Sequence, residues 1–475
     1  MDATRGDTPG RLGNAAAQNR WARTGGPEQV GQNRWGSRSS TADRLDAVER
    51  RRRVVVVGAG FGGLDLVKGL ADAPLDVVLV DANNFHTFQP LLYQVATAGL
   101  DSDDIAAPVR GIVRELDNVD VRLGTVVDID VEDRRLVLDE GPNVSYDRLV
   151  LATGAVTNTF GVPGVDEHGF GLKSLEDALR LRQHILRQFE RAAVDPSLVD
   201  EGVLDVIIAG GGPTGVELAG GIAELYRNVL SHDFPTLDVR KARVVIIEPG
   251  ERVLAPFHPK LAARATRTLN RLGVEVVFGI GVAGTDGKVV ELSDGSAVPC
   301  STLVWTAGVT ASPLAQVVAR HLGDDALTRG GRIVVTPELT IPGHPEIAVI
   351  GDLAASLDDD GNLLPQLAPV AMQGGRRVAA NLIGELSGAA PERFRYFDKG
   401  TMATVGRRNA VAQLPGKLRF SGTAGWLAWL GLHLIMLIGF RNRVNVLVNW
   451  AWNYVTMDRA SRLIVGDEDQ VVGSS

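Results

Sequence analysis

Two glycine-rich segments, about 150 residues apart, have the residue types and spacing that bind a dinucleotide. Each follows a short run of β-branched residues and precedes a helical stretch, which is the order strand, turn, helix. The first glycine of such a motif permits the tight turn, the second admits a pyrophosphate, and the third lets the helix pack closely. The N-terminus of the helix then faces the phosphates. The motif glycines are Gly58, Gly60 and Gly63 in the first segment, and Gly210, Gly212 and Gly215 in the second.

An acidic residue ends the next predicted strand in both segments, Asp81 in the first and Glu248 in the second. A carboxylate at this distance binds the ribose hydroxyls of a bound nucleotide. Because Glu248 would repel a 2′-phosphate, the second site is predicted to favour NADH over NADPH. Arg252 lies close by in the sequence and is the residue that could pair with such a phosphate.

Glu217 stands two residues after the third glycine of the second motif, in the first turn of the predicted helix. One interpretation is a solvated acid favoured by the helix dipole. The other is a carboxylate that faces the nicotinamide and takes part in catalysis. The sequence alone leaves both open.

Two nucleotide sites in one chain predict a permanently held flavin and a mobile nicotinamide, with FAD at the first motif and NADH at the second. A flavin needs a further contact from a distant segment, and Ile350-Gly351-Asp352 suits this role. Its glycine allows close approach and its carboxylate can bind ribityl hydroxyls. Ala152-Thr153-Gly154 and Thr306-Ala307-Gly308 are predicted to be the turns that close the two nucleotide domains.

The 475-residue composition excludes several other classes of protein. The net charge of −8 does not favour a nucleic-acid partner. The single cysteine, Cys300, rules out an internal disulfide, a redox cysteine pair and a cysteine-built zinc site, and it indicates a reducing, cytosolic setting. No metal site is predicted, and Cys300 is interpreted as a small buried hydrophobe.

The fold class predicted from this order is α/β, with two Rossmann-like dinucleotide-binding domains, one for FAD and one for NADH, plus a C-terminal membrane-associated helical region. Residues 165–200 contain a predicted linking helix. The predicted parts are a disordered tail over 1–52, the first part of the FAD domain over 54–168, the linker helix and NADH domain over 169–334, the second part of the FAD domain over 335–392, and a membrane-anchoring region over 393–475.

Across residues 54–465 the sequence resembles the two-dinucleotide-domain flavoproteins, and within them the type II, non-proton-pumping NADH:quinone oxidoreductases. The resemblance depends on the motifs already described, on 84–96 (NFHTFQPLLYQVA), on 365–373, and on two C-terminal motifs, 438–443 (IGFRNR) and 449–452 (NWAW). It implies bound FAD, reduction by NADH and reoxidation by a membrane quinone, either menaquinone or ubiquinone. Further cofactor-binding residues are then expected at Phe61, Gly62, Phe88, Gln89, Pro90, Thr153, Gly154, Pro213, Thr214, Gly308, Gly351 and Asp352, and catalytic residues at Glu217, Gln366 and Gln373.

The chain departs from the family pattern in the loop beside the flavin. The family commonly has A-Q-x-A-x-Q there, whereas this chain has Ala368-Pro369-Val370-Ala371-Met372-Gln373. Pro369 has no side-chain hydrogen bond and no backbone donor. A quinone contact at this position is therefore predicted to be lost, while Gln373 remains and Gln366 lies just upstream.

The C-terminal region is basic and rich in apolar residues. Between 393 and 462 it has 11 Lys or Arg against two Asp. The apolar run from Trp426 to Phe440 is too short to cross a bilayer comfortably, since a span needs about 20 residues. Arg441 and Arg443 follow, and then a segment with a stripe of asparagines that would face protein or water. These features predict a monotopic anchor at the cytoplasmic face of the membrane; a homodimer interface would use the same apolar surface. The stripe comprises Asn442, Asn445, Asn449 and Asn453.

The predicted function is therefore hydride transfer from NADH to FAD and then transfer of two electrons to a quinone, without proton pumping. Two alternatives stay open at this stage. One is a soluble NADH oxidase or ferredoxin-type reductase, which would not need the segment 425–455. The other is a flavin-bound NADH redox sensor, which would be reduced once and then stall.

Overall fold

The computed structural model describes residues 51–456, 459 and 461–465. The tail predicted over residues 1–52 lies outside this range except for its last two residues. Arg52 already belongs to the first strand, β1 (Arg52–Val57), so regular structure begins within the predicted tail.

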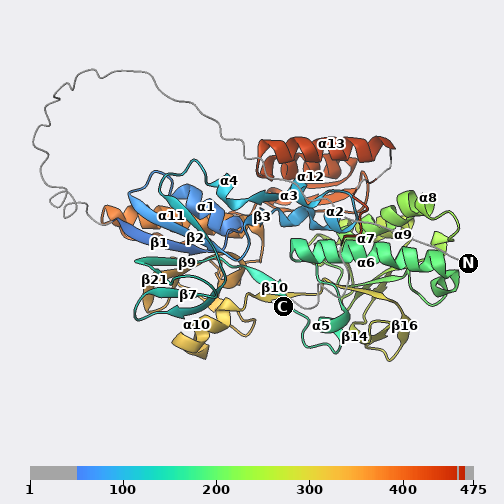
Figure 1. Ribbon diagram of the computed structural model, residues 1–475, viewed down its shortest axis with the longest axis horizontal. Coiled ribbons are helices and arrows are strands. Elements are labelled where there is room, and N and C mark those ends of the chain that lie inside the picture. The colour runs from blue at the N-terminus through green and yellow to red at the C-terminus, as the bar shows by residue number, and fades with distance from the viewer. Residues whose placement is uncertain (1–50, 457–458, 460, 466–475) are drawn as a thin grey trace, which may run out of the picture. The chain divides into compact units, whose positions relative to one another are not determined.

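Six strands form the first sheet, in the order β20-β21-β9-β1-β2-β5 (Figure 1). All neighbouring pairs are parallel except β20 and β21. The Val54–Val57 run of β1 is buried throughout, as a parallel strand covered on both faces requires. β21 comes from the segment after residue 335, so two distant parts of the chain build one sheet. The other bounds are β2 (Leu75–Asp81), β5 (Val119–Leu123), β9 (Arg148–Leu151), β20 (Thr340–Ile341) and β21 (His344–Val349).

Two helices pack against each other beside this sheet, α1 (Phe61–Gly69) and α11 (Ala368–Leu386). Their approach is close, because a Cβ at Gly375 of α11 would lie 2.3 Å from the Gly62 carbonyl oxygen. Pro369 occupies the first turn of α11, where its missing N–H costs no helical hydrogen bond. The replacement of glutamine by Pro369 is therefore compatible with the helix.

The second sheet has four parallel strands in the order β13-β12-β11-β17. As in the first sheet, the strand before the glycine turn is central, and the strand that ends in the acidic residue is beside it. Helices α7 and α9, both labelled in Figure 1, contact strands of this sheet, and α6 confirms the predicted linking helix. The bounds are β11 (Val206–Ala209), β12 (Val244–Glu248), β13 (Val274–Phe278), β17 (Thr302–Trp305), α6 (Leu175–Val194), α7 (Pro213–Leu225) and α9 (Pro259–Leu272).

The fold repeats itself around the two sheets. A three-stranded antiparallel sheet accompanies each one, and a short antiparallel ribbon, β10 with β18, connects the segments that follow β9 and β17. The α/β class with Rossmann-like sheets is thereby confirmed. The small elements are β3 (Phe85–Thr87) with β4 (Ala106–Pro108), β6 (Val126–Asp130), β7 (Arg135–Leu138), β8 (Val144–Ser145), β10 (Ala155–Thr157), β14 (Val282–Thr285), β15 (Val289–Leu292), β16 (Ala297–Pro299), β18 (Val309–Ala311), β19 (Ile333–Val334) and β22 (Ala354–Ala355).

The C-terminal region is a three-stranded sheet followed by two helices, α12 (Thr423–Met436) and α13 (Phe440–Thr456). The apolar helix expected to reach Phe440 ends earlier, at Met436, because Leu437 leaves the helical conformation with a ψ of 132°. In the described part of the chain, neither these helices nor any other has the length and apolarity to span a membrane. The strands are β23 (Thr401–Thr404), β24 (Ala410–Gln413) and β25 (Arg419–Gly422).

The asparagine stripe of α13 faces protein. Asn449 donates to the Asp104 carboxylate at 2.7 Å and Asn453 donates to the Gly99 carbonyl at 2.8 Å. Asn442 donates to the Ala106 carbonyl at 3.1 Å. The opposite side of α12 and α13 exposes apolar side chains, so the stripe fixes which face points outward. These outward residues include Leu427, Leu432, Ile435, Phe440, Val444, Leu447, Val448, Trp452 and Val455.

Candidate functional site

The first glycine turn is shaped so that only glycines fit, and it leaves one place open. Gly58 has a φ of +106°, and a Cβ there would lie 2.5 Å from the Ala152 carbonyl oxygen. A Cβ at Gly63 would lie 1.9 Å from the Gly58 oxygen, so α1 packs directly on the strand end. At Gly60 the nearest protein atom would be 4.0 Å away. The space above the second glycine is thus available to a ligand.

The second turn repeats this geometry at the start of α7. Gly210 also has a φ of +106°, and a Cβ there would lie 2.8 Å from Ala307 Cα. The Cβ of a residue at Gly215 would lie 2.1 Å from the Gly210 oxygen, whereas a Cβ at Gly212 would have no atom of the described chain within 4 Å. Pro213 opens α7, and Thr214 beside it is exposed at the helix N-terminus. The two predicted phosphate turns therefore have the same construction.

The two predicted ribose acids also make matching contacts. Asp81 accepts hydrogen bonds from the backbone N–H of Ala59 at 2.5 Å and of Asn83 at 2.7 Å. Glu248 accepts from Gly211 at 2.6 Å and from Gly250 at 2.7 Å. Each carboxylate therefore holds its glycine turn in place. Burial raises the pKa of Asp81, and the two backbone hydrogen bonds oppose that rise.

A large cavity of about 1040 Å³ opens over the first turn. Its walls come from β1, β2, the turn after β9, the start of α6 and the segment after β21. It is large enough for an extended dinucleotide, and residues between 350 and 371, where flavin contacts were predicted, form part of its wall. The predicted site residues that line it are Gly58, Gly60, Phe61, Gly62, Asp81, Gln89, Thr153, Gly154, Gly351, Asp352 and Gln366.

Polar groups inside this cavity fit a bound FAD. Asp352 lies 3.3 Å from the Lys173 ammonium, and the Gln366 amide donates to the Asp352 carbonyl at 3.1 Å. The His86 ring is buried and its Nδ1 lies 2.8 Å from the Ala59 carbonyl, while its buried Nε2 has no hydrogen-bond partner among the described residues. Burial lowers the pKa of His86, so the ring is neutral and Nε2 can accept a hydrogen bond from a ligand.

Four residues predicted for the flavin and acceptor side of the site lie outside the lining of this cavity. Gly63 is under the turn, and Phe88 packs edge-on against Phe61 with ring centroids 5.8 Å apart. Pro90 lies in the short turn Gln89–Leu91. Gln373 is occupied elsewhere, since its amide donates to the Phe397 carbonyl and accepts from the Phe397 N–H, both at 3.0 Å. It ties the segment after α11 to that helix.

Glu217 is not a solvated surface acid. Its carboxylate accepts from the Thr404 N–H at 3.0 Å and lies 3.4 Å from the Thr404 hydroxyl. Burial is the main cause that raises the pKa of Glu217 to about 8, although the hydrogen bonds from Thr404 act against it. These contacts contradict the interpretation of Glu217 as a solvated helix acid.

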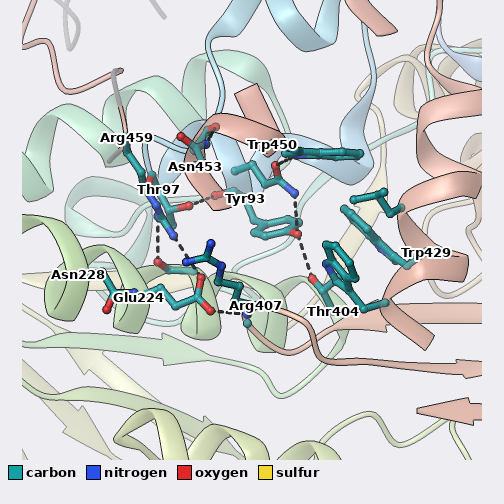
Figure 2. Close-up of a pocket in the computed structure, with 16 residues that line it drawn as sticks. Tyr93, Thr97, Glu224, Asn228, Thr404, Arg407, Trp429, Trp450, Asn453 and Arg459 are labelled. Carbon is teal, nitrogen blue, oxygen red and sulfur yellow. Dashed lines mark hydrogen bonds and ion pairs between the residues drawn. The ribbon is translucent and has the colours of Figure 1, made fainter. Parts of the chain in front are cut away.

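Thr404 connects Glu217 to a pocket of about 100 Å³ under the C-terminal helices (Figure 2). The Tyr93 hydroxyl lies 2.9 Å from the Thr404 hydroxyl, and Gln94 donates to Tyr93 at 2.9 Å. Trp450 of α13 in turn donates to Gln94 at 2.7 Å. A continuous set of hydrogen-bonding groups thus runs from Glu217 to α13.

The environment of Cys300 confirms the interpretation of this residue as a small buried hydrophobe. The residue is buried, and its sulfur lies 3.3 Å from the backbone carbonyl oxygens of both Asp205 and Thr302, either of which can accept its hydrogen. Burial raises its pKa to about 11, so the thiolate that a redox or nucleophilic cysteine needs is disfavoured.

A chain with two such nucleotide sheets and a cavity of this kind is a two-dinucleotide-domain flavoprotein. The family model described as pyridine nucleotide-disulphide oxidoreductase matches residues 52–375, and that of the NDH2 C-terminal domain matches 399–457. The type II NADH:quinone oxidoreductase Ndh of Mycobacterium tuberculosis is 42% identical over 431 residues, covering 88% of this chain and 91% of that protein. NdhA of the same organism is 39% identical, covering 88% and 90%.

Among solved structures, NDH2 from Plasmodium falciparum in complex with NADH has a TM-score of 0.81 at 18% identity, covering 88% of this chain and all of that one. This likeness supports the fold. The sequence identities show the family: the chain belongs to the type II NADH:quinone oxidoreductases, flavoenzymes that pass electrons from NADH to a quinone without pumping protons. Of the three functions that the sequence left open, this family membership favours electron transfer from NADH to a quinone.

The structure adds residues to the site that the sequence analysis missed. Lys173 precedes α6 and reaches Asp352, which is 179 residues away. Thr404 reaches Glu217 across 187 residues. Neither has a local motif, and a lysine or threonine is common on any surface. The only sequence signal was that both partners, Asp352 and Glu217, were acids predicted to lie near a cofactor.

Proposed function

We propose that FAD lies in the large cavity and that NADH binds across the turn Gly210–Gly215, with the nicotinamide and the flavin ring in contact between the two sites. Bound FAD would supply hydride acceptance from NADH and electron transfer to a quinone. The observation that carries this proposal is the matched geometry of the two turns, each with an open second glycine and a carboxylate-held backbone.

The chain's own residues divide the binding work. The N-termini of α1 and α7 present backbone N–H groups to the two pyrophosphates. Asp81 and Glu248 face the ribose hydroxyls of their respective nucleotides. Asp352, paired with Lys173, and Gln366 would hold the ribityl and ring end of FAD.

We propose that Glu217 holds the proton that quinone reduction consumes. NADH supplies a hydride, and a quinone that becomes a quinol needs one more proton. A carboxyl group with a pKa of about 8 is mostly protonated at pH 7 and still close enough to that pH to release its proton. The hydroxyls of Thr404 and Tyr93 could return a proton to it from the pocket in Figure 2.

Gln373 remains a candidate residue on the acceptor side. Because its amide holds the backbone of Phe397, it would act by positioning the segment after α11. With Pro369 in place of the family's first glutamine, the acceptor would have one hydrogen-bond partner fewer on this helix. The choice between menaquinone and ubiquinone is not determined by these contacts.

We propose that the outward face of α12 and α13 rests on the cytoplasmic face of the membrane. Ile435, Phe440 and Val455 are 70%, 81% and 83% exposed, a large apolar surface for a water-facing protein. Arg441 and Arg443 beside it suit anionic headgroups. A homodimer contact through the same face is the alternative.

Vesicle flotation tests this placement. The variant Ile435→Ser with Val455→Ser is expected to float poorly with vesicles that contain anionic lipid, while NADH still reduces its flavin. Val194→Ser is the matched control, because Val194 is 88% exposed at the end of α6. Unchanged flotation together with a shift from dimer to monomer would favour the dimer interface instead.

A further inference from the structure

An exposed aromatic side chain stands in the segment that follows β10. Phe160 is 64% exposed, although large aromatic rings are usually covered. Its φ is +54°, in the left-handed region that a bulky residue enters only at a cost. Such outliers persist where surrounding contacts enforce them, and they concentrate at ligand sites.

The contacts that enforce this conformation attach the loop to the second nucleotide domain. Asn158 accepts through its side chain from the Phe160 N–H at 2.9 Å. The Asn158 carbonyl accepts from the Trp305 indole at 2.7 Å, and the Asn158 N–H donates to the Gly308 carbonyl at 3.1 Å. The N–H and the carbonyl of Asn158 thus both attach this loop to the end of β17 and the turn that follows it.

The Phe160 ring lies directly against Gly308. A Cβ at Gly308 would be 2.6 Å from Phe160 Cζ and 2.8 Å from Cε2, so any other residue there would push the ring away. Gly308 was predicted as a cofactor-binding residue from the sequence. The structure supplies a specific reason for glycine at this position, which is to seat an aromatic ring.

This ring is next to the path expected for the second nucleotide. The turn Thr306–Gly308 contacts the phosphate turn, because the Thr306 hydroxyl donates to the Gly210 carbonyl at 3.1 Å. The adenosine end lies toward Glu248 on β12. Since β17 is on the opposite side of β11, the nicotinamide end must extend across Thr306–Gly308. The equivalent turn of the first domain, Thr153-Gly154, lines the FAD cavity.

We propose that Phe160 is a binding residue for the nicotinamide half of NADH, with its exposed ring packed against the nicotinamide riboside. The ring is held before the ligand arrives, so binding need not order it. The inference rests on the proposed position of NADH at the turn Gly210–Gly215. It adds a residue, on a different loop, that distinguishes the two ends of the dinucleotide.

Steady-state kinetics of the FAD-loaded enzyme tests the proposal. Phe160→Ala is expected to raise the KM for NADH by roughly three- to tenfold, the size of one aromatic contact. The inhibition constant of ADP-ribose, which lacks nicotinamide, should change by less than about twofold. Phe160→Trp should restore the KM, and Val194→Ala is the exposed apolar control.

A second variant separates the ring from its backbone. Phe160→Gly removes both the ring and the cost of a positive φ, so it should melt no lower than the wild type and still have the raised KM. The proposal is overturned if KM for NADH does not change in Phe160→Ala, if ADP-ribose weakens by the same factor, or if Phe160→Gly restores the KM.

The failure of this inference can be told apart from failure of the NADH site itself. If NADH binds at the second turn, Glu248→Ser alters the preference for NADH over NADPH whatever Phe160 does. A changed preference with an unaffected KM in Phe160→Ala would reject the role of Phe160 alone. An unchanged preference would reject the site on which the inference depends.

Discussion

Replacing Glu217 by glutamine should change how the stability of the protein depends on pH. The pKa of this carboxyl is about 8 in the folded chain and 4.5 ordinarily. Between these values the folded state retains a proton that the unfolded state has lost, so wild-type stability falls as the pH rises. The slope is about 1.4 kcal/mol per pH unit, and the whole effect is at most about 5 kcal/mol.

Glutamine keeps the shape of the protonated acid and does not titrate. The free energy of unfolding of Glu217→Gln, minus that of the wild type, should therefore grow from pH 5 to pH 8 and level off above pH 8. Denaturant unfolding of the FAD-loaded proteins at each pH measures it. Glu190→Gln, on the exposed face of α6, controls for the loss of one charge. A difference that stays flat across this range would show that Glu217 is not held protonated by burial.

Three further predictions concern the cofactor turns and the C-terminal helices. Glu248→Ser should reduce an NADH preference of at least about tenfold in kcat/KM, because a carboxylate no longer opposes the 2′-phosphate; steady-state kinetics with both cofactors measures it. Gly58→Ala should yield protein with little FAD, read from its absorbance, because the added methyl would lie 2.5 Å from the Ala152 carbonyl oxygen. Asn449→Ala should cost about 1–3 kcal/mol of stability, seen in thermal melting, since the buried Asp104 loses its partner on α13.

The glycine turns could be predicted because their function is a local requirement on the backbone. A φ of +106° at Gly58 and at Gly210 demands glycine, and the demand appears in the sequence at fixed spacing. The ribose acids could be predicted as well, because each stands at the end of the next strand and binds the backbone of its own glycine turn. These parts of the site depend on contacts within one βαβ unit.

The rest of the site depends on contacts between distant segments, which leave no spacing to detect. Glu217 was ambiguous because its environment is set by Thr404, which arrives on β23. Gln373 was predicted as a catalytic residue, and nothing in its sequence neighbourhood indicated that its amide also binds the backbone of Phe397. The end of α12 was placed too late because the apolar run continues past Met436, although the backbone leaves the helical conformation at Leu437.

The central claim is that this chain passes electrons from NADH through its flavin to a quinone. Rapid mixing of the FAD-loaded protein, bound to vesicles that contain menaquinone or ubiquinone, tests it with flavin absorbance as the readout. We expect NADH to bleach the flavin within one turnover and the quinone to restore the oxidised spectrum, repeatedly, without added dye. Flavin that is bleached once and stays reduced in the presence of either quinone would contradict the claim.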